Sequence, residues 1–352
     1  MTRVLRFRLA RPAPLLCRWD LDKTYLRSEF DTLRQLWRTA WERGEDKVAV
    51  PGVPELVKAL KTAADRHGRT IATYFVSASP PQIGKAIRDK LALDRVPYDG
   101  ITFKNQLEHL KRGKFRNLRE HVGFKLGELL RGRRLAPPGA HELLFGDDWE
   151  SDPLTYSLYA DVLAGLLPVA ALGVALRRIG VDPLVVPELT TLAAEVRAGG
   201  GVERILINLA RRTPPIALRV FGPRLVPTFN YFQTALVLAA MGHLDPVDVA
   251  TIADALVTRH GYTSRRLGYS LDDLVRRGVL TPHAARVASG ALRRARLLGE
   301  VRPSPPVARL REWAHDVRTR RRAVLPPAAL DYGTIFETFP NLARARAAEG
   351  KS

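Results

Sequence analysis

Short apolar segments alternate with amphipathic segments over the first ~165 residues of this 352-residue chain. Four apolar segments have the length and composition of buried strands: 14–19, 70–76, 100–103 and 141–146. Amphipathic spacing predicts helices in the stretches between them: 30–42, 54–64, 81–91 and 120–130. A further helix opens at Asp152, where the following proline occupies a permitted first-turn position. This alternation predicts an α/β fold, a parallel sheet with flanking helices.

The character of the chain changes near residue 180, where strand-like segments give way to sequence rich in Ala, Leu, Val and Arg. Periodic segments there predict helices at 186–198, 202–211, 228–241, 246–259, 270–277 and 282–298. We therefore expect an α/β domain over 1–175, a mostly helical domain over 180–300, and a Pro/Arg-rich linker and tail over 301–352.

Composition constrains the compartment. Cys17 is the one cysteine, which excludes an internal disulfide and fits a reducing environment. The arginine-containing N-terminus has no continuous apolar region, so no secretory signal is predicted. The longest apolar run, Val162 to Leu176, is interrupted by Pro168 and is shorter than the ~20 residues of a membrane-spanning helix, so a buried helix is expected. We expect a cytoplasmic protein that can lie at a membrane surface.

The chain is strongly basic, with a net charge of +20. This charge favours acidic partners, namely phosphorylated substrates, anionic lipid surfaces or nucleic acid, although a coding bias towards arginine explains it equally well. The segment Arg293–Arg322 is the strongest candidate for contact with an anionic surface, and a solvated helix face with a linker is the alternative. Phe229, Tyr231 and Phe232 are candidates for burial in a bilayer, but aromatic residues at helical spacing more often belong to a core.

Two carboxylates, Asp20 and Asp22, follow the first apolar segment directly. Ligands of open α/β sheets bind outside the carboxyl ends of the strands, so both acids are expected at a binding site. Asp20 can attack a phosphorus atom as a nucleophile, and Asp22 can act as the general acid and base. Thr24 can add a hydrogen bond. The same residue types also favour turns and helix N-caps, so this motif alone is not decisive.

The second apolar segment leads into Ser77 and Ser79. A hydroxyl and backbone N–H groups at a strand-to-helix turn can bind phosphate, and Ser77 is preferred because it follows the strand immediately. Helix capping by both serines is the alternative. Lys125 is the candidate cation that would neutralise the phosphate and Asp20, with Lys104 as the second choice.

The fourth apolar segment runs into Gly146, Asp147 and Asp148, and Asp152 follows at the next helix start. Mg²⁺ prefers carboxylate, water and phosphate oxygens in octahedral geometry, and Asp147 with Asp20 supplies the carboxylates. Asp152 or Asp148 can complete the shell. If these acids converge, a metal is needed to offset their repulsion. A solvated acidic loop is the alternative.

The order of these motifs resembles the haloacid dehalogenase superfamily. The stretches that carry the resemblance are WDLDKT at 19–24, FVSASP at 75–80 and FGDDWESDPLTY at 145–156. Within the superfamily, residues 14–170 are most similar to the catalytic domain of the actin-patch-associated phosphatidate phosphatases. The resemblance implies a Rossmann-like parallel sheet.

The resemblance also implies roles for individual residues: Asp20 as nucleophile and Mg²⁺ ligand, Asp22 as general acid/base with its carbonyl on the metal, Ser77 and Lys125 as phosphate-binding residues, and Asp147 as a metal ligand with Asp152 in support. We also assign Thr24 to phosphate binding and Asp152 to the metal. Two positions depart from the family pattern. Lys23 stands where the lipid phosphatases commonly have an acid, and Phe124 stands where a histidine is usual.

We therefore expect a Mg²⁺-dependent phosphatase that forms an aspartyl-phosphate and hydrolyses phosphatidate or a related phospholipid phosphomonoester. One alternative keeps the chemistry and changes the substrate to a nucleic-acid end, a phosphoprotein or a metabolite. Another is a non-catalytic scaffold whose helical half binds a partner.

Overall fold

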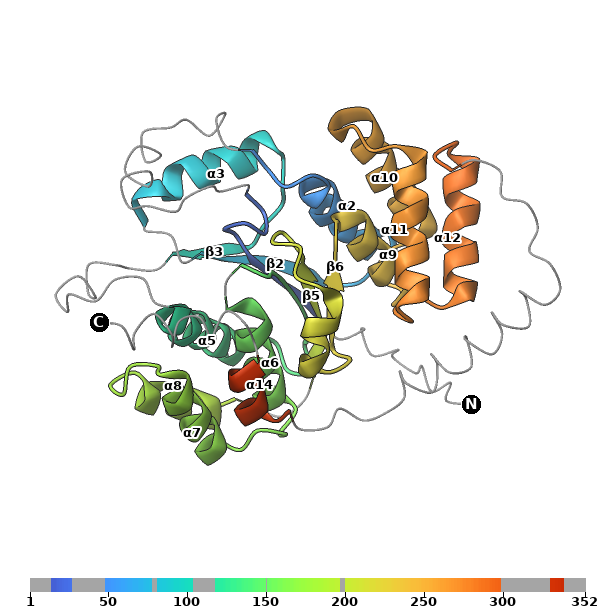
Figure 1. Ribbon diagram of the computed structural model, residues 1–352. Coiled ribbons are helices and arrows are strands. Elements are labelled where there is room, and N and C mark those ends of the chain that lie inside the picture. The colour runs from blue at the N-terminus through green and yellow to red at the C-terminus, as the bar shows by residue number, and fades with distance from the viewer. Residues whose placement is uncertain are drawn as a thin grey trace, which may run out of the picture.

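The computed structural model describes residues 14–26, 48–77, 81–103, 118–149, 151–196, 200–298 and 330–338. Their centre is a six-stranded parallel sheet with strand order β3-β2-β1-β4-β5-β6 (Figure 1). The strands are β1 (Leu15–Asp20), β2 (Ile71–Ser77), β3 (Gly100–Phe103), β4 (His141–Asp147), β5 (Gly201–Asn208) and β6 (Leu225–Thr228).

The direction of strand order changes at β1, because β2 and β3 lie on one side of it and β4 to β6 on the other. Such a change creates a crevice at the carboxyl ends of the two central strands, where open α/β sheets bind their ligands. In the register of β1 and β4, Trp19 lies beside Phe145, and their rings stack with centroids 3.7 Å apart. Asp20 and Asp147 therefore leave the sheet at the same edge.

Helices cover both faces of the sheet (Figure 1). On one face lie α2 (Val53–Arg66), the short 3-10 helix η2 (Pro81–Ile83), α3 (Gly84–Leu93), α9 (Tyr231–Ala240), α10 (Pro246–His260), α11 (Ser264–Arg276) and α12 (Pro282–Arg294). On the other lie α5 (Leu118–Arg134), α6 (Asp152–Leu163), α7 (Val169–Ile179), α8 (Val186–Ala194), the 3-10 helix η3 (Pro215–Phe221) and α14 (Tyr332–Thr338).

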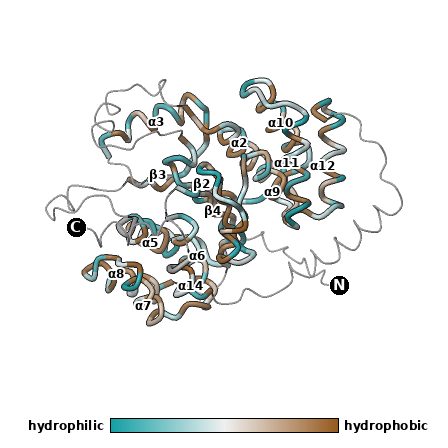
Figure 2. Tube along the Cα trace, viewed as in Figure 1, coloured by the Kyte–Doolittle hydropathy of each residue, from teal (hydrophilic) through white to brown (hydrophobic). Residues whose placement is uncertain are grey.

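The alternation of side chains along the strands produces two cores. Leu143 and Phe145 of β4 join the core beneath α2 and α9, whereas Leu144 between them joins the core beneath α5 and α6. Successive residues of a strand point to opposite faces, so a strand covered on both faces is almost continuously apolar. Figure 2 shows this, with hydrophobic residues running through the central strands and both kinds of residue alternating along the outer helices.

The predicted α/β fold is confirmed. All four predicted strands are present, each within one residue of its expected bounds. Helices also occur at 53–66, 84–93 and 118–134, as expected, and the predicted helix at 81–91 begins as a short 3-10 turn. The predicted helix at 30–42 lies outside the described residues.

The prediction that strands end near residue 180 is wrong. The segment 202–211, expected to be a helix, forms β5 and pairs with β4, and β6 adds an edge strand beyond it. The apolar run Ile205–Ile207 is too short for periodicity to distinguish a buried strand from a helix. Pro227 sits in β6, where an edge strand tolerates a residue without an N–H.

The remainder of the C-terminal region is helical, as predicted, from α7 to α12. The division into domains at 1–175 and 180–300 stays a prediction, although two strands of the sheet come from the second of these segments. Most of 301–352 lies outside the described residues, as does most of Arg293–Arg322.

The apolar run Val162–Leu176 forms the end of α6 and most of α7, and Pro168 is the N-cap residue of α7. Among the described residues, no helix has both the length and the apolar character to cross a bilayer.

Candidate active site

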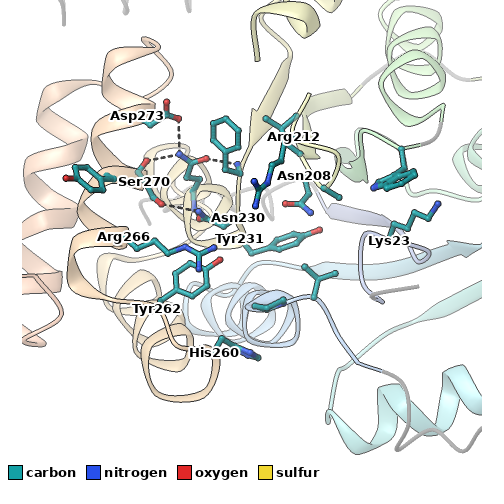
Figure 3. Close-up of a pocket in the computed structure, with 18 residues that line it drawn as sticks. Lys23, Asn208, Arg212, Asn230, Tyr231, His260, Tyr262, Arg266, Ser270 and Asp273 are labelled. Atoms are coloured by element: carbon teal, nitrogen blue, oxygen red, sulfur yellow. Dashed lines mark hydrogen bonds between the residues drawn. The ribbon is translucent and has the colours of Figure 1, made fainter. Parts of the chain in front are cut away.

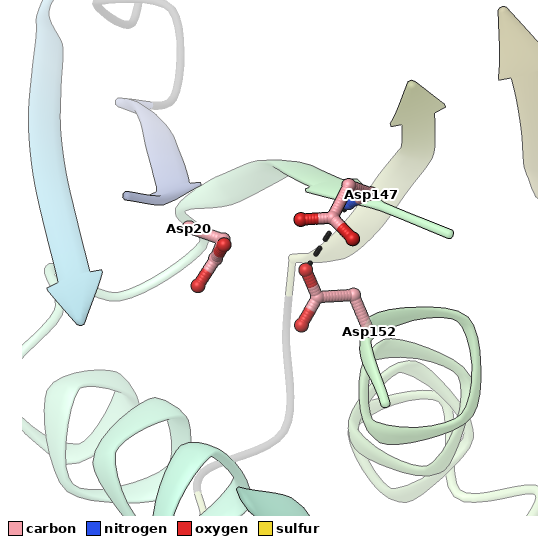
Figure 4. A group of neighbouring side chains, drawn as sticks. All are labelled: Asp20, Asp147 and Asp152. Carbon is pink, nitrogen blue, oxygen red and sulfur yellow. Dashed lines mark hydrogen bonds between the residues drawn. The ribbon is translucent and has the colours of Figure 1, made fainter. Parts of the chain in front are cut away.

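Three carboxylates converge at the crevice between β1 and β4. Asp20 ends β1, Asp147 ends β4, and Asp152 opens α6. One oxygen from each lies within 4.8 Å of the others, and all three residues are fully buried. Figure 4 shows the three side chains directed towards a common centre. The sequence offered Asp20 and Asp147 as the carboxylates of one metal site, with Asp152 or Asp148 to complete it, and the structure brings Asp20, Asp147 and Asp152 together.

Gly146 allows Asp152 to approach the sheet this closely. A Cβ atom at position 146 would lie 2.5 Å from Oδ2 and 2.7 Å from Cβ of Asp152, and 2.8 Å from Cε2 of Tyr156. Real Cβ atoms do not come this close to their neighbours. The same proximity lets the backbone N–H of Asp147 donate to Oδ2 of Asp152, at 3.2 Å. The glycine that precedes Asp147 in β4 is therefore required by packing.

Lys125 reaches the carboxylates from α5. Its Nζ lies 2.7 Å from Oδ1 of Asp20 and 2.5 Å from Oδ1 of Asp152, and the side chain is 1% exposed. A lysine this deeply buried needs partners of opposite charge, and these two acids provide them. Lys104, the second choice for the same role, lies outside the described residues.

The donor set fits a divalent cation. The ammonium of Lys125 offsets one of the three negative charges of the buried carboxylates, and a divalent ion would offset the other two. Carboxylate oxygens are hard ligands of the kind that Mg²⁺ binds in proteins. Asp20, Asp147 and Asp152 are therefore the residues of the described structure that can hold a metal ion.

Asp22 is not in this carboxylate group. Its Oδ2 accepts a hydrogen bond of 2.8 Å from the Ser77 hydroxyl, at the end of β2. Thr24 donates to Oδ2 of Asp147 at 3.2 Å, and is fully buried. The two hydroxyl groups that the sequence assigned to phosphate binding thus contact acids of the site in this structure. Ser79 lies outside the described residues.

Asp148 points away from the other acids and holds a neighbouring loop. Its carboxylate accepts hydrogen bonds from the backbone N–H groups of Arg211 at 2.8 Å and of Thr213 at 3.0 Å. The suggestion that Asp148 could complete the metal shell in place of Asp152 is therefore not supported by this geometry, since Asp152 is the acid within the group.

Two tyrosines that sequence reasoning did not place at the site lie at its border. Tyr156 of α6 donates to the carbonyl of Phe145 at 3.2 Å, and Tyr231 of α9 donates to the carbonyl of Thr24 at 2.9 Å. Burial raises the pKa of both hydroxyl groups, and the nearby carboxylates raise it further, so both remain protonated donors. Tyr156 lies in the 145–156 stretch that carries the family resemblance, whereas no local sequence signal links Tyr231 to residues near position 24.

The aromatic residues proposed for membrane contact divide into two kinds. Tyr231 is 2% exposed and Phe232 is 0% exposed, so both belong to the core, which is the alternative that the sequence favoured over burial in a bilayer. Phe229 is 43% exposed.

Residues 19–171 match the catalytic domain of phosphatidate phosphatase APP1. The match confirms the resemblance expected from the motifs. It spans the residues described above from Asp20 to Tyr156 and ends within α7. Comparisons with curated proteins and with solved structures gave no significant match.

The APP1 match leaves β5, β6 and α8 to α14 outside its range. These elements nevertheless complete the sheet and contribute Tyr231 to the border of the site.

Proposed function

We propose that this protein is a Mg²⁺-dependent phosphatase that forms an aspartyl-phosphate and hydrolyses phosphatidate or a related phospholipid phosphomonoester. The observation that carries the proposal is the convergence of Asp20, Asp147, Asp152 and Lys125 at the sheet crevice, inside the segment that matches the APP1 catalytic domain. The substrate class is taken from the phosphatidate phosphatase activity of that family.

Asp20 is the proposed nucleophile. One of its carboxylate oxygens attacks the phosphorus atom, and the bond from phosphorus to the leaving-group oxygen breaks. Asp22 donates a proton to that oxygen. In the second step Asp22 takes a proton from water, the water oxygen attacks the aspartyl-phosphate, and phosphate leaves as the Asp20 carboxylate is regenerated. The hydrogen bond from Ser77 positions Asp22 before the substrate binds.

The buried cation and the hydroxyl groups have supporting roles. Lys125 already contacts Asp20 and would also neutralise charge that develops on the phosphoryl oxygens. Thr24 and Ser77 are proposed to hydrogen-bond the phosphoryl group. Each hydroxyl would then release the carboxylate that it contacts in this structure and donate to a phosphoryl oxygen in its place.

Asp20, Asp147 and Asp152 would hold Mg²⁺, with Asp22 contributing its backbone carbonyl. A bound Mg²⁺ ion supplies Lewis-acid stabilisation of phosphoryl charge. The acyl chains of a phospholipid would stay in the bilayer, so the proposal includes a cytoplasmic protein that attaches to an anionic membrane surface. Its net charge of +20 favours that attachment.

Phosphate release from a substrate panel tests the proposal. The panel contains dioleoyl phosphatidate vesicles, p-nitrophenyl phosphate, nucleotides and a 5′-phosphorylated oligonucleotide, each with Mg²⁺ or with EDTA. We expect Mg²⁺-dependent release from phosphatidate, and a loss of at least about a thousandfold in Asp20→Asn, which keeps the shape of the side chain and removes the nucleophile.

Asp254→Asn, an exposed position on α10, is the matched control and should behave like the wild type. Release from a non-lipid substrate alone would keep the chemistry and refute the lipid substrate. Mg²⁺ binding without release from any member of the panel would favour a non-catalytic scaffold.

A further inference from the structure

A groove of about 1090 Å³ lies beside the candidate active site and runs towards the C-terminal helices. Its near end is formed by Lys23 and Trp149, which flank residues of the site in sequence, since Lys23 lies between Asp22 and Thr24. Its far end is formed by residues of α10 and α11, among them His260 and Arg266 (Figure 3). Most of the groove is therefore built by elements outside the APP1 match.

The groove is electropositive. Lys23, Arg212 and Arg266 line it along its length, and Asp273 is the one acidic residue among the described lining residues. The carboxylate of Asp273 already accepts from Arg276 at 3.0 Å and from Arg277 at 2.8 Å, so its charge is compensated. Figure 3 shows Lys23 at one end, Arg212 near Tyr231 in the middle, and Arg266 at the other end.

Two of these cations are held in place by aromatic rings. The Nζ of Lys23 lies 4.2 Å from the ring centroid of Trp149, and the guanidinium carbon of Arg266 lies 3.7 Å from that of Tyr262. A cation over an aromatic face is attracted by the ring quadrupole. Both rings line the groove, so they restrict where the two charges can lie within it.

Backbone conformation restricts Lys23 and Arg212 further. Their φ angles are 62° and 59°, in the left-handed region that residues other than glycine rarely adopt. Such strain is maintained where the surrounding structure over-determines the chain, and it concentrates at binding sites. Arg95 and Arg296 share the conformation but follow helix C-termini, where it is common.

The placement of the aromatic rings argues against a strand of nucleic acid as the ligand. Nonspecific single-strand binding needs open aromatic faces on which bases stack. Trp149 instead carries Lys23 and also Arg211, whose guanidinium carbon lies 4.3 Å from the ring centroid, and Tyr262 carries Arg266. The more exposed rings of Tyr269 and Phe229 also face arginines, Arg265 at 5.3 Å and Arg277 at 5.7 Å. These rings orient cations, which favours a compact anionic ligand.

We propose that the groove binds a second phosphate group, carried by the leaving group of the substrate. The preferred substrates would then be phosphomonoesters that bear another phosphate, as a monoester or a diester, on a polyol. This inference rests on the proposed phosphatase function, since the near end of the groove adjoins Asp22 and Thr24. It assigns to the C-terminal helices the selection of the leaving group.

The test compares inositol 1,4-bisphosphate with inositol 4-phosphate, which differ by one phosphate. We expect kcat/KM for the bisphosphate to exceed that for the monophosphate about tenfold or more, because a charge-assisted hydrogen bond to one guanidinium contributes about that factor. Arg266→Gln and Arg212→Gln should each reduce the ratio about tenfold. Arg219→Gln, an exposed change of the same charge on η3 outside the groove, should not change it.

A lipid arm distinguishes the source of the phosphate. Phosphatidylinositol 4-phosphate carries its phosphomonoester on a polyol headgroup that bears a second phosphate. Phosphatidate carries a phosphomonoester alone, and vesicles of the two lipids are compared. A higher kcat/KM for the phosphoinositide than for phosphatidate, lost in Arg266→Gln, would identify a lipid headgroup as the source of the second phosphate. A higher kcat/KM seen only with the soluble bisphosphate would identify a free organophosphate as the source. Either result supports the second phosphate site.

Equal kcat/KM for the two soluble substrates, unchanged by Arg266→Gln, would overturn the inference and leave the phosphatase function standing. If no substrate is turned over, calorimetry on the Asp20→Asn protein decides. Binding of inositol 1,4-bisphosphate about tenfold tighter than inositol 4-phosphate, and lost on adding Arg266→Gln, would uphold the groove even though the phosphatase function had failed. Absence of that difference would overturn it.

Discussion

Replacing Lys125 by methionine tests whether the candidate site is held together by charge. The substitution keeps an unbranched side chain of similar length and removes the ammonium that lies 2.7 Å from Asp20 and 2.5 Å from Asp152. All three side chains are at most 1% exposed, so water cannot replace the lost partner. Removing one member of a buried ion pair costs about 3–5 kcal/mol, because the charge left behind is uncompensated.

We therefore expect Lys125→Met to lower the free energy of unfolding by about 4 kcal/mol in EDTA. The two contacts share one ammonium, so their contributions are not simply added. Urea unfolding followed by circular dichroism at neutral pH measures the change. Lys85→Met is the matched control, since Lys85 pairs with Asp89 at a position where its side chain is 84% exposed, and it should change stability by less than about 1 kcal/mol.

Two further measurements separate charge from packing. Mg²⁺ should narrow the difference in stability between Lys125→Met and the wild type, because the variant keeps one more uncompensated negative charge at the site and so gains more from a bound cation than the wild type does. Adding Asp152→Asn to Lys125→Met should recover part of the loss, since it removes one of the uncompensated charges. A cost below about 1 kcal/mol in EDTA, with no effect of Mg²⁺, would refute the charge arrangement.

Three other predictions follow from the same structure. Gly146→Ala should destabilise the fold by about 1–3 kcal/mol and reduce phosphatase activity, because the added methyl group displaces Asp152; urea unfolding and phosphate release measure the two effects. Asp148→Asn should cost about 1 kcal/mol in urea unfolding and leave Mg²⁺ binding by calorimetry unchanged, since one part-buried backbone N–H in the neighbouring loop loses its acceptor. Hydrogen bonding from His243 lowers the pKa of Glu203 from its ordinary 4.5, so its stabilising contribution is present above that value and is lost as the pH falls through the folded-state pKa. Glu203→Gln should flatten the acid side of the stability–pH profile, and an unaltered profile would contradict this assignment.

Local sequence was sufficient to predict the first four strands and the acids that follow them. Asp20 and Asp147 come directly after short apolar runs, and parallel strands present their carboxyl ends at one edge. The sequence therefore predicted that these two side chains meet. The motif order also offered Asp152 as a third acid, with Asp148 as the alternative, and Lys125 as the cation, with Lys104 as the second choice. In the structure Asp152 and Lys125 lie beside Asp20.

The same local patterns were ambiguous where apolar runs are short. Ile205–Ile207 is compatible with a helix or a buried strand, and only pairing with β4 decides between them. The role of Asp148 was equally undetermined, since its partners lie 63 and 65 positions away in the loop after β5. A sequence of acids does not show which one faces the metal and which one holds a backbone loop.

By itself, the sequence determined which residues carry charge or reactivity and which strand each of them follows, because periodicity and motif order are local properties. Tertiary structure alone decided which distant segments complete the site. Tyr231 donates to the carbonyl of Thr24 across 207 positions, and Arg266 of α11 lines the groove that begins at Lys23. Such contacts arise from the packing of helices against a sheet face, which depends on the whole hydrophobic core and leaves no pattern in either segment.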